Sequence, residues 1–234
     1  MSTTDHVIQK GRWAFDDEVA FVFDDMLARS IPAYAEMRRV VSEVGRRFLR
    51  EPGRVVDLGT SRGEALASLL DYKPNALGIA CEIASPMAAH ARTYLARFAN
   101  VAVVEIDLRR DYPTLDEVDV VLSVLTLQFV PIEHRWTILA NARDSLRPGG
   151  ALVLVEKVLG STPATDRLLV DAYLDRKREN GYSDEEIDRK RLALEGVLVP
   201  VTAETNEQML SRAGFDAVEP VWRSLNFAGW VAVR

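Results

Sequence analysis

Hydrophobic and polar positions follow two different patterns along the chain, and the change falls near residue 54. In residues 13–29, apolar side chains recur every three or four positions, which predicts an amphipathic helix. Pro32 interrupts this pattern, and we expect a second helix over residues 33–50. From residue 54 onward, short runs that are apolar throughout alternate with helical segments. Such runs are typical of a mostly parallel sheet that helices cover on both faces, so the sequence predicts an α/β fold.

The alternation of strands and helices stops after residue 157. Helices are expected at about 165–180, 184–195 and 204–213, and the chain closes with two strands separated by a short break. Strands that are joined this closely are usually antiparallel, because a parallel pair needs a long crossover. The sheet is therefore expected to end in a β-hairpin.

The stretch "DLGTSRGEAL", residues 57–66, is a strand, a glycine turn and a helix start. Gly59 can lie where the backbone must approach a ligand closely, and the helix that begins near Gly63 turns its N–H groups toward that ligand. Three residues separate the two glycines, so the stretch is not the GxGxxG fingerprint of dinucleotide-binding proteins.

Acidic and polar residues follow the next strands in order. Glu82, at the end of the second strand, can accept hydrogen bonds from both hydroxyls of a ribose. Asp107 ends the third strand and can meet an adenine amino group. Residues 123–126 end the fourth strand, where substrates usually lie in open sheets. Any one of these acids alone would be explained by a helix cap or a surface position, but their order favours a nucleoside site.

The motifs "VVDLGTSRG", Glu82, Asp107 and "LRPGGALVLVE" resemble those of the class I S-adenosylmethionine (SAM)-dependent methyltransferases over roughly residues 50–234. This resemblance implies a Rossmann-like, seven-stranded, mostly parallel sheet that ends in an antiparallel hairpin. Residues 1–50 would form a helical lid. Residues 51–234 would form the SAM-binding domain, with a helical insertion at about 160–200. The bound species would be SAM, carboxy-SAM or S-adenosylhomocysteine.

Five further stretches extend the resemblance over nearly the whole chain: "WAFDDEVAFVFDDMLARSIPAY", "LTLQFV", "KRENGYSDEEIDRKRLALEGVLVP", "AGF" and "LNFAGWVAV". They resemble the carboxy-SAM synthase family. The resemblance implies that SAM and prephenate react to give carboxy-SAM and phenylpyruvate, and that the product supplies a separate enzyme that modifies the wobble uridine of tRNA. It also implies that the departing carboxyl group removes the methyl proton. The protein would then mainly position the reactants and neutralise a carboxylate.

The family resemblance also implies roles for individual residues. The expected ligand contacts are Tyr34 from the lid, Gly59, Thr60 and Ser61 at the methionine end, Glu82 and Ile83 beside ribose and adenine, Asp107 and Leu108 at the adenine, and Ser123 or Val124 near the methionine amino group. Gly63 would belong to the same loop. Arg191 would bind the new carboxylate, and Arg191 and Tyr34 are the expected catalytic residues.

The chain departs from the family pattern at several of these positions. Thr60 stands in place of a cysteine, Glu82 in place of an aspartate and Ile83 in place of an asparagine, and the stretch "SVL" carries an extra residue. Two alternatives therefore stay open: a conventional methyltransferase that acts on a small, possibly anionic metabolite, and a non-catalytic SAM-binding module. A dehydrogenase disagrees with both the glycine pattern and the terminal hairpin.

The charged run from Lys177 to Arg191 bears on the expected carboxylate contact. Ser183 and Glu186 have the spacing of a capping box, so a helix should begin between them. Arg191 lies four residues after Ile187 and shares its face. If that face packs inward, Arg191 points inward too and meets a carboxylate there.

Composition and charge limit the classes of partner that the protein can bind and the cellular compartment that suits it. The net charge of −6 and the pI of about 5.2 argue against direct nucleic-acid binding. No apolar run approaches the length of a membrane span, and the N-terminus carries no secretory signal. Cys81 is the single cysteine, which suits a reducing compartment. We expect a cytoplasmic protein that acts on a small carboxylate, has no metal site because its three histidines lack partners at metal-binding spacing, and, by resemblance, forms a homodimer.

Overall fold

The computed structural model describes Asp5, Val7 and residues 11–234. The helices are α1 (Asp17–Ser30), α2 (Tyr34–Phe48), α3 (Glu64–Leu70), α4 (Ser85–Leu95), α5 (Ile132–Ser145), α6 (Pro163–Glu179), α7 (Asp184–Leu194) and α8 (Ala203–Arg212), and a 3-10 turn spans Leu127–Phe129. The strands are β1 (Arg54–Leu58), β2 (Leu77–Glu82), β3 (Val101–Glu105), β4 (Val118–Val124), β5 (Leu146–Leu159), β6 (Val201–Thr202), β7 (Ala217–Ser224) and β8 (Phe227–Val233).

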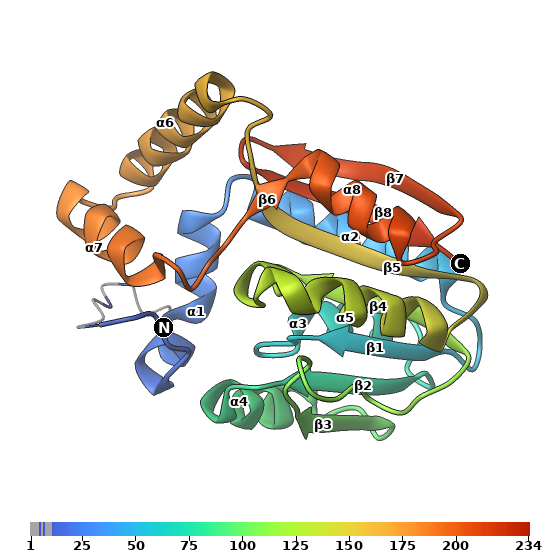
Figure 1. The fold of residues 1–234 in the computed structure, drawn as a ribbon. Coiled ribbons are helices and arrows are strands. Elements are labelled where there is room, and N and C mark those ends of the chain that lie inside the picture. Colours follow the sequence, from blue (N-terminus) through green and yellow to red (C-terminus); the bar gives the residue numbers. More distant parts are fainter. Residues whose placement is uncertain (1–4, 6, 8–10) are drawn as a thin grey trace.

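One mixed sheet runs through the described part of the chain in the order β3-β2-β1-β4-β5-β8-β7 (Figure 1). Strands β1 to β5 pair in parallel, whereas β8 lies antiparallel to both β5 and β7. The two-residue strand β6 adds to the edge of β5. The predicted seven-stranded α/β sheet with a terminal hairpin is therefore confirmed, with β6 as a small addition.

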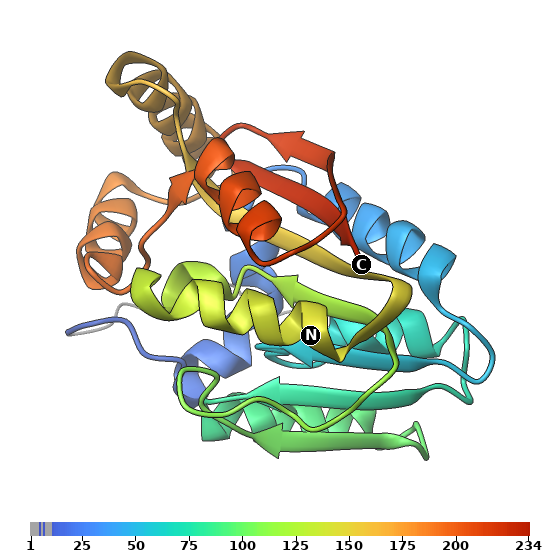
Figure 2. The ribbon, with the colours of Figure 1, turned by 45° about the vertical axis from the view of Figure 1, so that its right-hand side comes forward.

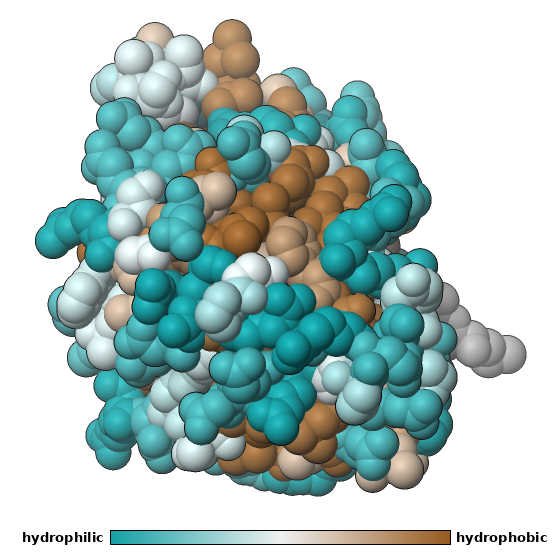
Figure 3. Space-filling model, turned by 90° about the vertical axis from the view of Figure 1, so that its right-hand side faces the viewer, coloured by the Kyte–Doolittle hydropathy of each residue, from teal (hydrophilic) through white to brown (hydrophobic). Residues whose placement is uncertain are grey.

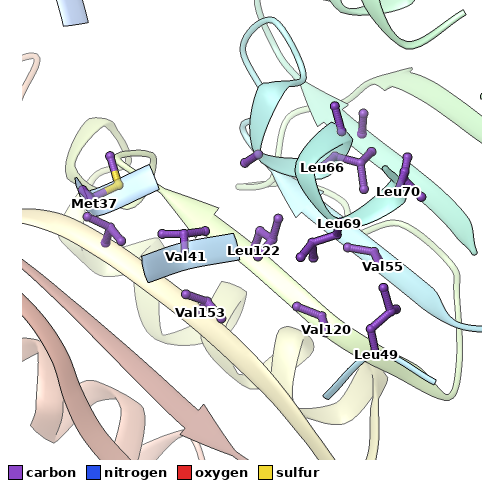
Figure 4. Close-up of a cluster of buried hydrophobic side chains, with 14 of the residues drawn as sticks. Met37, Val41, Leu49, Val55, Leu66, Leu69, Leu70, Val120, Leu122 and Val153 are labelled. Carbon is purple, nitrogen blue, oxygen red and sulfur yellow. The ribbon is translucent and has the colours of Figure 1, made fainter. Parts of the chain in front are cut away.

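Helices cover both faces of the sheet, and neighbouring residues of each strand divide between two cores because side chains alternate along a strand. Val55 and Val120 pack with helices α2, α3 and α4, and Figure 4 shows this cluster. Val56 and Val121 pack instead with α5 and α8, which lie in front of the sheet in Figure 2. Burial on both faces explains why these strands are apolar throughout.

The insertion and the N-terminal helix gather at one end of the sheet. Helices α1, α6 and α7 lie beyond the end toward which the arrow of β1 points (Figure 1). Helix α6 projects from the body, and of its side chains only that of Lys177 is buried. Helix α2, in contrast, packs flat on the sheet through Met37 and Val41. Residues 17–48 therefore divide between a helix at the strand ends and a helix of the sheet core.

A buried carboxylate stabilises the opposite end of the sheet. Asp119, near the start of β4, accepts hydrogen bonds from Arg50 Nε at 2.6 Å, Arg147 Nε at 2.5 Å and the backbone N–H of Arg54 at 2.8 Å. Figure 3 shows this end as a mostly hydrophilic surface with an apolar area among the polar residues. No helix in the described part of the chain is long and apolar enough to cross a membrane.

Two short sequence motifs have a clear place in the fold. The capping box is confirmed, because Ser183 Oγ accepts from Glu186 N–H and a Glu186 carboxylate oxygen accepts from Ser183 N–H at 2.8 Å. The "RPGG" part of the motif "LRPGGALVLVE" lies inside the bounds of β5. The pairing register with β4 shifts there, and Gly149 takes a φ of +71°.

Candidate functional site

Two adjoining cavities open at the carboxyl ends of the strands. The first, here called the inner cavity, has an empty volume of about 1050 Å³ and is lined by α1, α2, the β1–α3 loop, β5, α6 and α7. The second, here called the edge cavity, has an empty volume of about 790 Å³ and is lined by the same loop and by the ends of β2 and β3. Both include Gly59 and Ser61 in their walls, so the glycine loop separates the two cavities.

The conformation of the β1–α3 loop requires its glycine. Gly59 has a φ of +70°, and a Cβ added there would lie 2.9 Å from Cβ of Thr126 and closer still to the Thr126 Cγ2. Thr60 Oγ1 donates a hydrogen bond of 2.7 Å to Asp57 Oδ2. The loop therefore turns tightly between the two cavities, as the sequence predicted.

Glu82 is fixed by the backbone around it. Its carboxylate accepts hydrogen bonds from the N–H groups of Ser61 at 2.8 Å and of Ile83 and Ala84 at 2.9 Å. Burial raises the pKa of this carboxyl, while the three N–H groups act in the opposite direction. Glu82 lines the edge cavity, and its two oxygens can accept more hydrogen bonds than these three, which fits the expected acceptance of ribose hydroxyls.

Asp107, Leu108 and Ile83 line the edge cavity, as expected for a nucleoside base. Asp107 also accepts a bidentate pair of hydrogen bonds from Arg109 Nε and Nη2, at 2.8 and 2.7 Å. These bonds lower the pKa of the Asp107 carboxyl to about 2. A base amino group that binds Asp107 would therefore share the carboxylate with Arg109, a contact that the sequence did not predict.

Acidic groups dominate the inner cavity beside the glycine loop. Burial raises the pKa of Asp57 to about 6, and it also raises the pKa of Glu64. Arg38 opposes both shifts, and Arg62, whose Nε lies 3.7 Å from Glu64 and which also pairs with Asp24, opposes the shift of Glu64. Tyr34 lies on the same wall, as expected, and burial raises the pKa of its hydroxyl to about 12. This part of the cavity suits a ligand that carries an ammonium group.

Lysines occupy another part of the inner cavity. Lys157 from β5, Lys177 from α6 and Lys190 from α7 all line it. Lys190 forms an ion pair with the buried carboxylate of Asp5, which also accepts a hydrogen bond of 2.5 Å from the Tyr182 hydroxyl. The inner cavity therefore combines an acidic part with a basic part.

The inward orientation predicted for Arg191 is wrong. Its side chain is 61% exposed, and its Nε lies 3.5 Å from Asp188. The buried face of α7 consists of Ile187, Lys190 and Ala193, because the helix packs along the i+3 row rather than the i+4 row. The cation that α7 directs into the cavity is therefore Lys190.

Two other expected residues lie away from both cavity walls. Ser123 is fully buried within β4, and its Oγ has no hydrogen-bond partner among the described residues. Its neighbour Val124 does line the inner cavity. Gly63 begins α3 with a φ of +93°, and a Cβ there would lie 2.8 Å from Leu95. Gly63 thus allows the loop to approach α4, a role in packing.

The three lysines of the inner cavity were not predicted from the sequence. Lys157 follows the apolar run of β5, so its position at a strand end could have identified it. Lys177 and Lys190 lie in a charged run that looked like solvated helix surface. No three His, Cys, Asp or Glu side chains in the described residues gather as metal ligands.

Comparisons with known proteins agree with this geometry. A family model described as a methyltransferase domain matches residues 55–150. The chain is 38% identical to a carboxy-S-adenosyl-L-methionine synthase of Methylococcus capsulatus, over 95% of this chain and 93% of that protein. It is 37% identical to the synthase of that name from Nitratiruptor, over 95% and 93% of the two chains.

Solved structures share the fold at low sequence identity. An O-methyltransferase family protein from Burkholderia thailandensis superimposes with a TM-score of 0.66 and 22% identity, over 94% of this chain and 60% of that one. Human N-acetylserotonin methyltransferase in complex with SAM gives a TM-score of 0.62 and 14% identity, over 93% and 55%. The chain thus spans less than two thirds of these two structures. The near full-length likeness to the synthases decides the family: this chain belongs to the carboxy-S-adenosyl-L-methionine synthases, on a class I methyltransferase fold.

Proposed function

We propose that the protein makes carboxy-SAM from SAM and a small carboxylate donor, prephenate. The observation that carries this proposal is the glycine loop between an edge cavity with a ribose acceptor and an inner cavity with both acidic and basic walls. In the net reaction, the ring carboxyl group of prephenate becomes bonded to the former methyl carbon of SAM. The methyl proton and the ring hydroxyl leave as water, and phenylpyruvate remains.

The residues present fit SAM. Glu82 would accept the ribose hydroxyls, and Asp107 with Leu108 would contact the adenine. Asp57 and Glu64 would face the methionine ammonium group from the inner cavity. When bound, SAM supplies a sulfonium that makes its methyl group electron-poor.

Tyr34 takes part as a hydrogen-bond donor in this proposal. Because burial raises the pKa of its hydroxyl to about 12, the group keeps its proton at neutral pH. Aromatic side chains of the N-terminal segment, Trp13, Phe15 and Phe23, line the same cavity and contact one another edge to face. We propose that α1 and the segment before it serve as the lid that excludes water, whereas α2 belongs to the sheet core.

We further propose that the protein is a homodimer through the insertion. Ten of the seventeen residues of helix α6 are exposed, including Leu168 at 66%, and Leu192 of α7 and Phe21 of α1 are exposed as well. Arg191 lies on the outer face of α7, so its expected carboxylate contact would require a ligand or a second chain at that face. The single, buried Cys81 is consistent with a cytoplasmic location, where carboxy-SAM would supply wobble-uridine modification.

Two measurements test the proposed function. Mass spectrometry of the ligand that copurifies with the protein should show SAM, carboxy-SAM or S-adenosylhomocysteine. Incubation with SAM and prephenate should then yield phenylpyruvate and a SAM species heavier by one carboxyl group. Methyl transfer to another metabolite would identify a conventional methyltransferase instead. Tight SAM binding without turnover of any substrate would indicate a binding module.

A further inference from the structure

Two lysines of the inner cavity, the half-buried Lys157 and the buried Lys177, form no ion pair with an acid among the described residues. Among the described residues, no carboxylate lies within 4.0 Å of the ammonium group of Lys157 or Lys177, although Lys177 is only 6% exposed. Lys190 differs, because Asp5 neutralises it. A buried charge without a partner is costly, so such groups usually mark the place of a ligand.

Aromatic rings stabilise the ammonium groups of these two lysines in part. The Nζ of Lys157 lies 4.7 Å from the ring centroid of Tyr173 and 6.0 Å from that of Phe227. The Nζ of Lys177 lies 5.5 Å from the Tyr173 centroid and 4.9 Å from the Tyr182 centroid. Ring faces are weakly negative and leave most of a cationic charge available. Both ammonium groups therefore adjoin one ring, Tyr173, and both border the cavity.

Lys73 also lies over a tyrosine ring, but away from both cavities, and it serves as a comparison. Its Nζ lies 5.4 Å from the ring centroid of Tyr72, but it also has Glu51 at 3.3 Å. Lys73 borders neither of the two cavities. A lysine on a ring is thus paired with an acid at the surface, whereas the two cavity lysines lack one.

We propose that Lys157 and Lys177 form a carboxylate subsite that positions and selects the anionic co-substrate, with the rings of Tyr173 and Phe227 against its unsaturated body. The identity of that co-substrate as prephenate rests on the proposed function. Lys157 comes from the sheet and Lys177 from the insertion, so a bound carboxylate also joins α6 to the sheet core. Two ammonium groups on one carboxylate give charge-assisted hydrogen bonds from two sides.

The subsite has a pH dependence of defined sign. Burial, then Lys190 and Lys157, lower the pKa of Lys177 to about 8, while Asp5 acts against the shift and Arg29 with it. The ammonium form binds an anion and the amine form does not. Prephenate affinity should therefore fall as the pH rises above about 8. Lys177→Arg should reduce that decline, because arginine stays charged, but burial lowers the pKa of Lys157 too, so that lysine still titrates.

The test is calorimetric titration of Lys157→Gln and Lys177→Gln with prephenate and, separately, with S-adenosylhomocysteine. Each variant should bind prephenate about tenfold or more weakly, and S-adenosylhomocysteine as the wild type does. In turnover assays the loss should fall mainly on KM for prephenate. Lys73→Gln is the matched control and should change neither affinity. Lysine-to-arginine variants should recover part of the prephenate affinity.

The outcomes separate the subsite from the proposed function. If folded glutamine variants bind prephenate as tightly as the wild type does, the subsite is overturned even where carboxy-SAM is made. If the wild type makes no carboxy-SAM but binds phenylpyruvate through both lysines, the subsite stands and the proposed function fails. If the glutamine variants do not fold, the wild-type pH titration decides, because an affinity that is flat from pH 7 to 9.5 contradicts a role for Lys177.

Discussion

Replacement of Gly59 by alanine should damage both the fold and SAM binding, for two reasons that can be separated. The first reason is the φ of +70°, which costs an L-residue about 1–2 kcal/mol. The second is the overlap of the added Cβ with the side chain of Thr126, which lies closer than 3.0 Å. Overpacking of this kind costs about 1–3 kcal/mol. Gly59→Ala should therefore lower the free energy of unfolding by about 2–5 kcal/mol.

Gly149 offers a matched control for the backbone effect. Its φ is +71°, but an added Cβ would meet only the Arg147 side chain, at 3.4 Å. Gly149→Ala should lose about 1–2 kcal/mol from strain alone. The difference between the two variants measures the overlap with Thr126, which pushes the loop and moves the Ser61 N–H away from Glu82.

The assays are urea unfolding at pH 7 and calorimetric titration with S-adenosylhomocysteine. Gly59→Ala should weaken binding by about tenfold or more, since each tenfold corresponds to about 1.4 kcal/mol. Gly149→Ala lies at the far end of the sheet and should bind as the wild type does. Equal stability losses in the two variants, together with unchanged binding by Gly59→Ala, would refute this account of the loop.

Three further predictions concern buried charges. Asp57→Asn should raise the free energy of unfolding at pH 7 by about 3 kcal/mol, because burial raises the pKa of Asp57 in the folded state from 3.8 to about 6. Ionisation of Asp57 therefore destabilises the wild-type fold as the pH rises from 4 to 6. Urea unfolding at pH 4 and 7 should show that the wild type loses stability between these pH values and that the variant does not. Asp5→Ala leaves Lys190 buried and unpaired and should cost about 3–5 kcal/mol by the same assay, whereas Asp5→Ala with Lys190→Met should recover most of the loss. Glu82→Gln should weaken S-adenosylhomocysteine binding about 10- to 100-fold by calorimetry, and an unchanged affinity would exclude Glu82 as the ribose acceptor.

The strands and the edge cavity were predictable because they depend on local patterns. Burial on both faces makes a parallel strand apolar throughout, and the carboxyl ends of such strands share one edge of the sheet. Gly59 directly follows β1, Glu82 is the last residue of β2 and Asp107 lies two residues after β3, so their positions in the chain fix their positions at that edge. The pairing of Asp107 with Arg109, two residues away, was not foreseen, since either residue could have faced solvent.

The insertion was harder to predict because its side chains take their roles from distant contacts. The rotation of α7 about its axis depends on what the helix packs against. The residue three positions after Ile187, Lys190, is buried, whereas the residue four positions after it, Arg191, is exposed. Lys190 meets Asp5, 185 positions away in the chain. The ammonium groups of Lys157 and Lys177 lie near the same ring, that of Tyr173, although 20 positions separate them in the chain. A local sequence pattern cannot predict contacts between side chains that lie this far apart in the chain.

The fate of one carbon atom tests the proposed function most directly. Prephenate labelled with ¹³C in its ring carboxyl group would be incubated with SAM and the purified protein, and both products would be identified by mass spectrometry. We expect the label in a carboxyl group on the SAM-derived product, and we expect phenylpyruvate to be unlabelled. A SAM-derived product without the label, or release of the labelled carbon only as carbon dioxide, would contradict the proposed function.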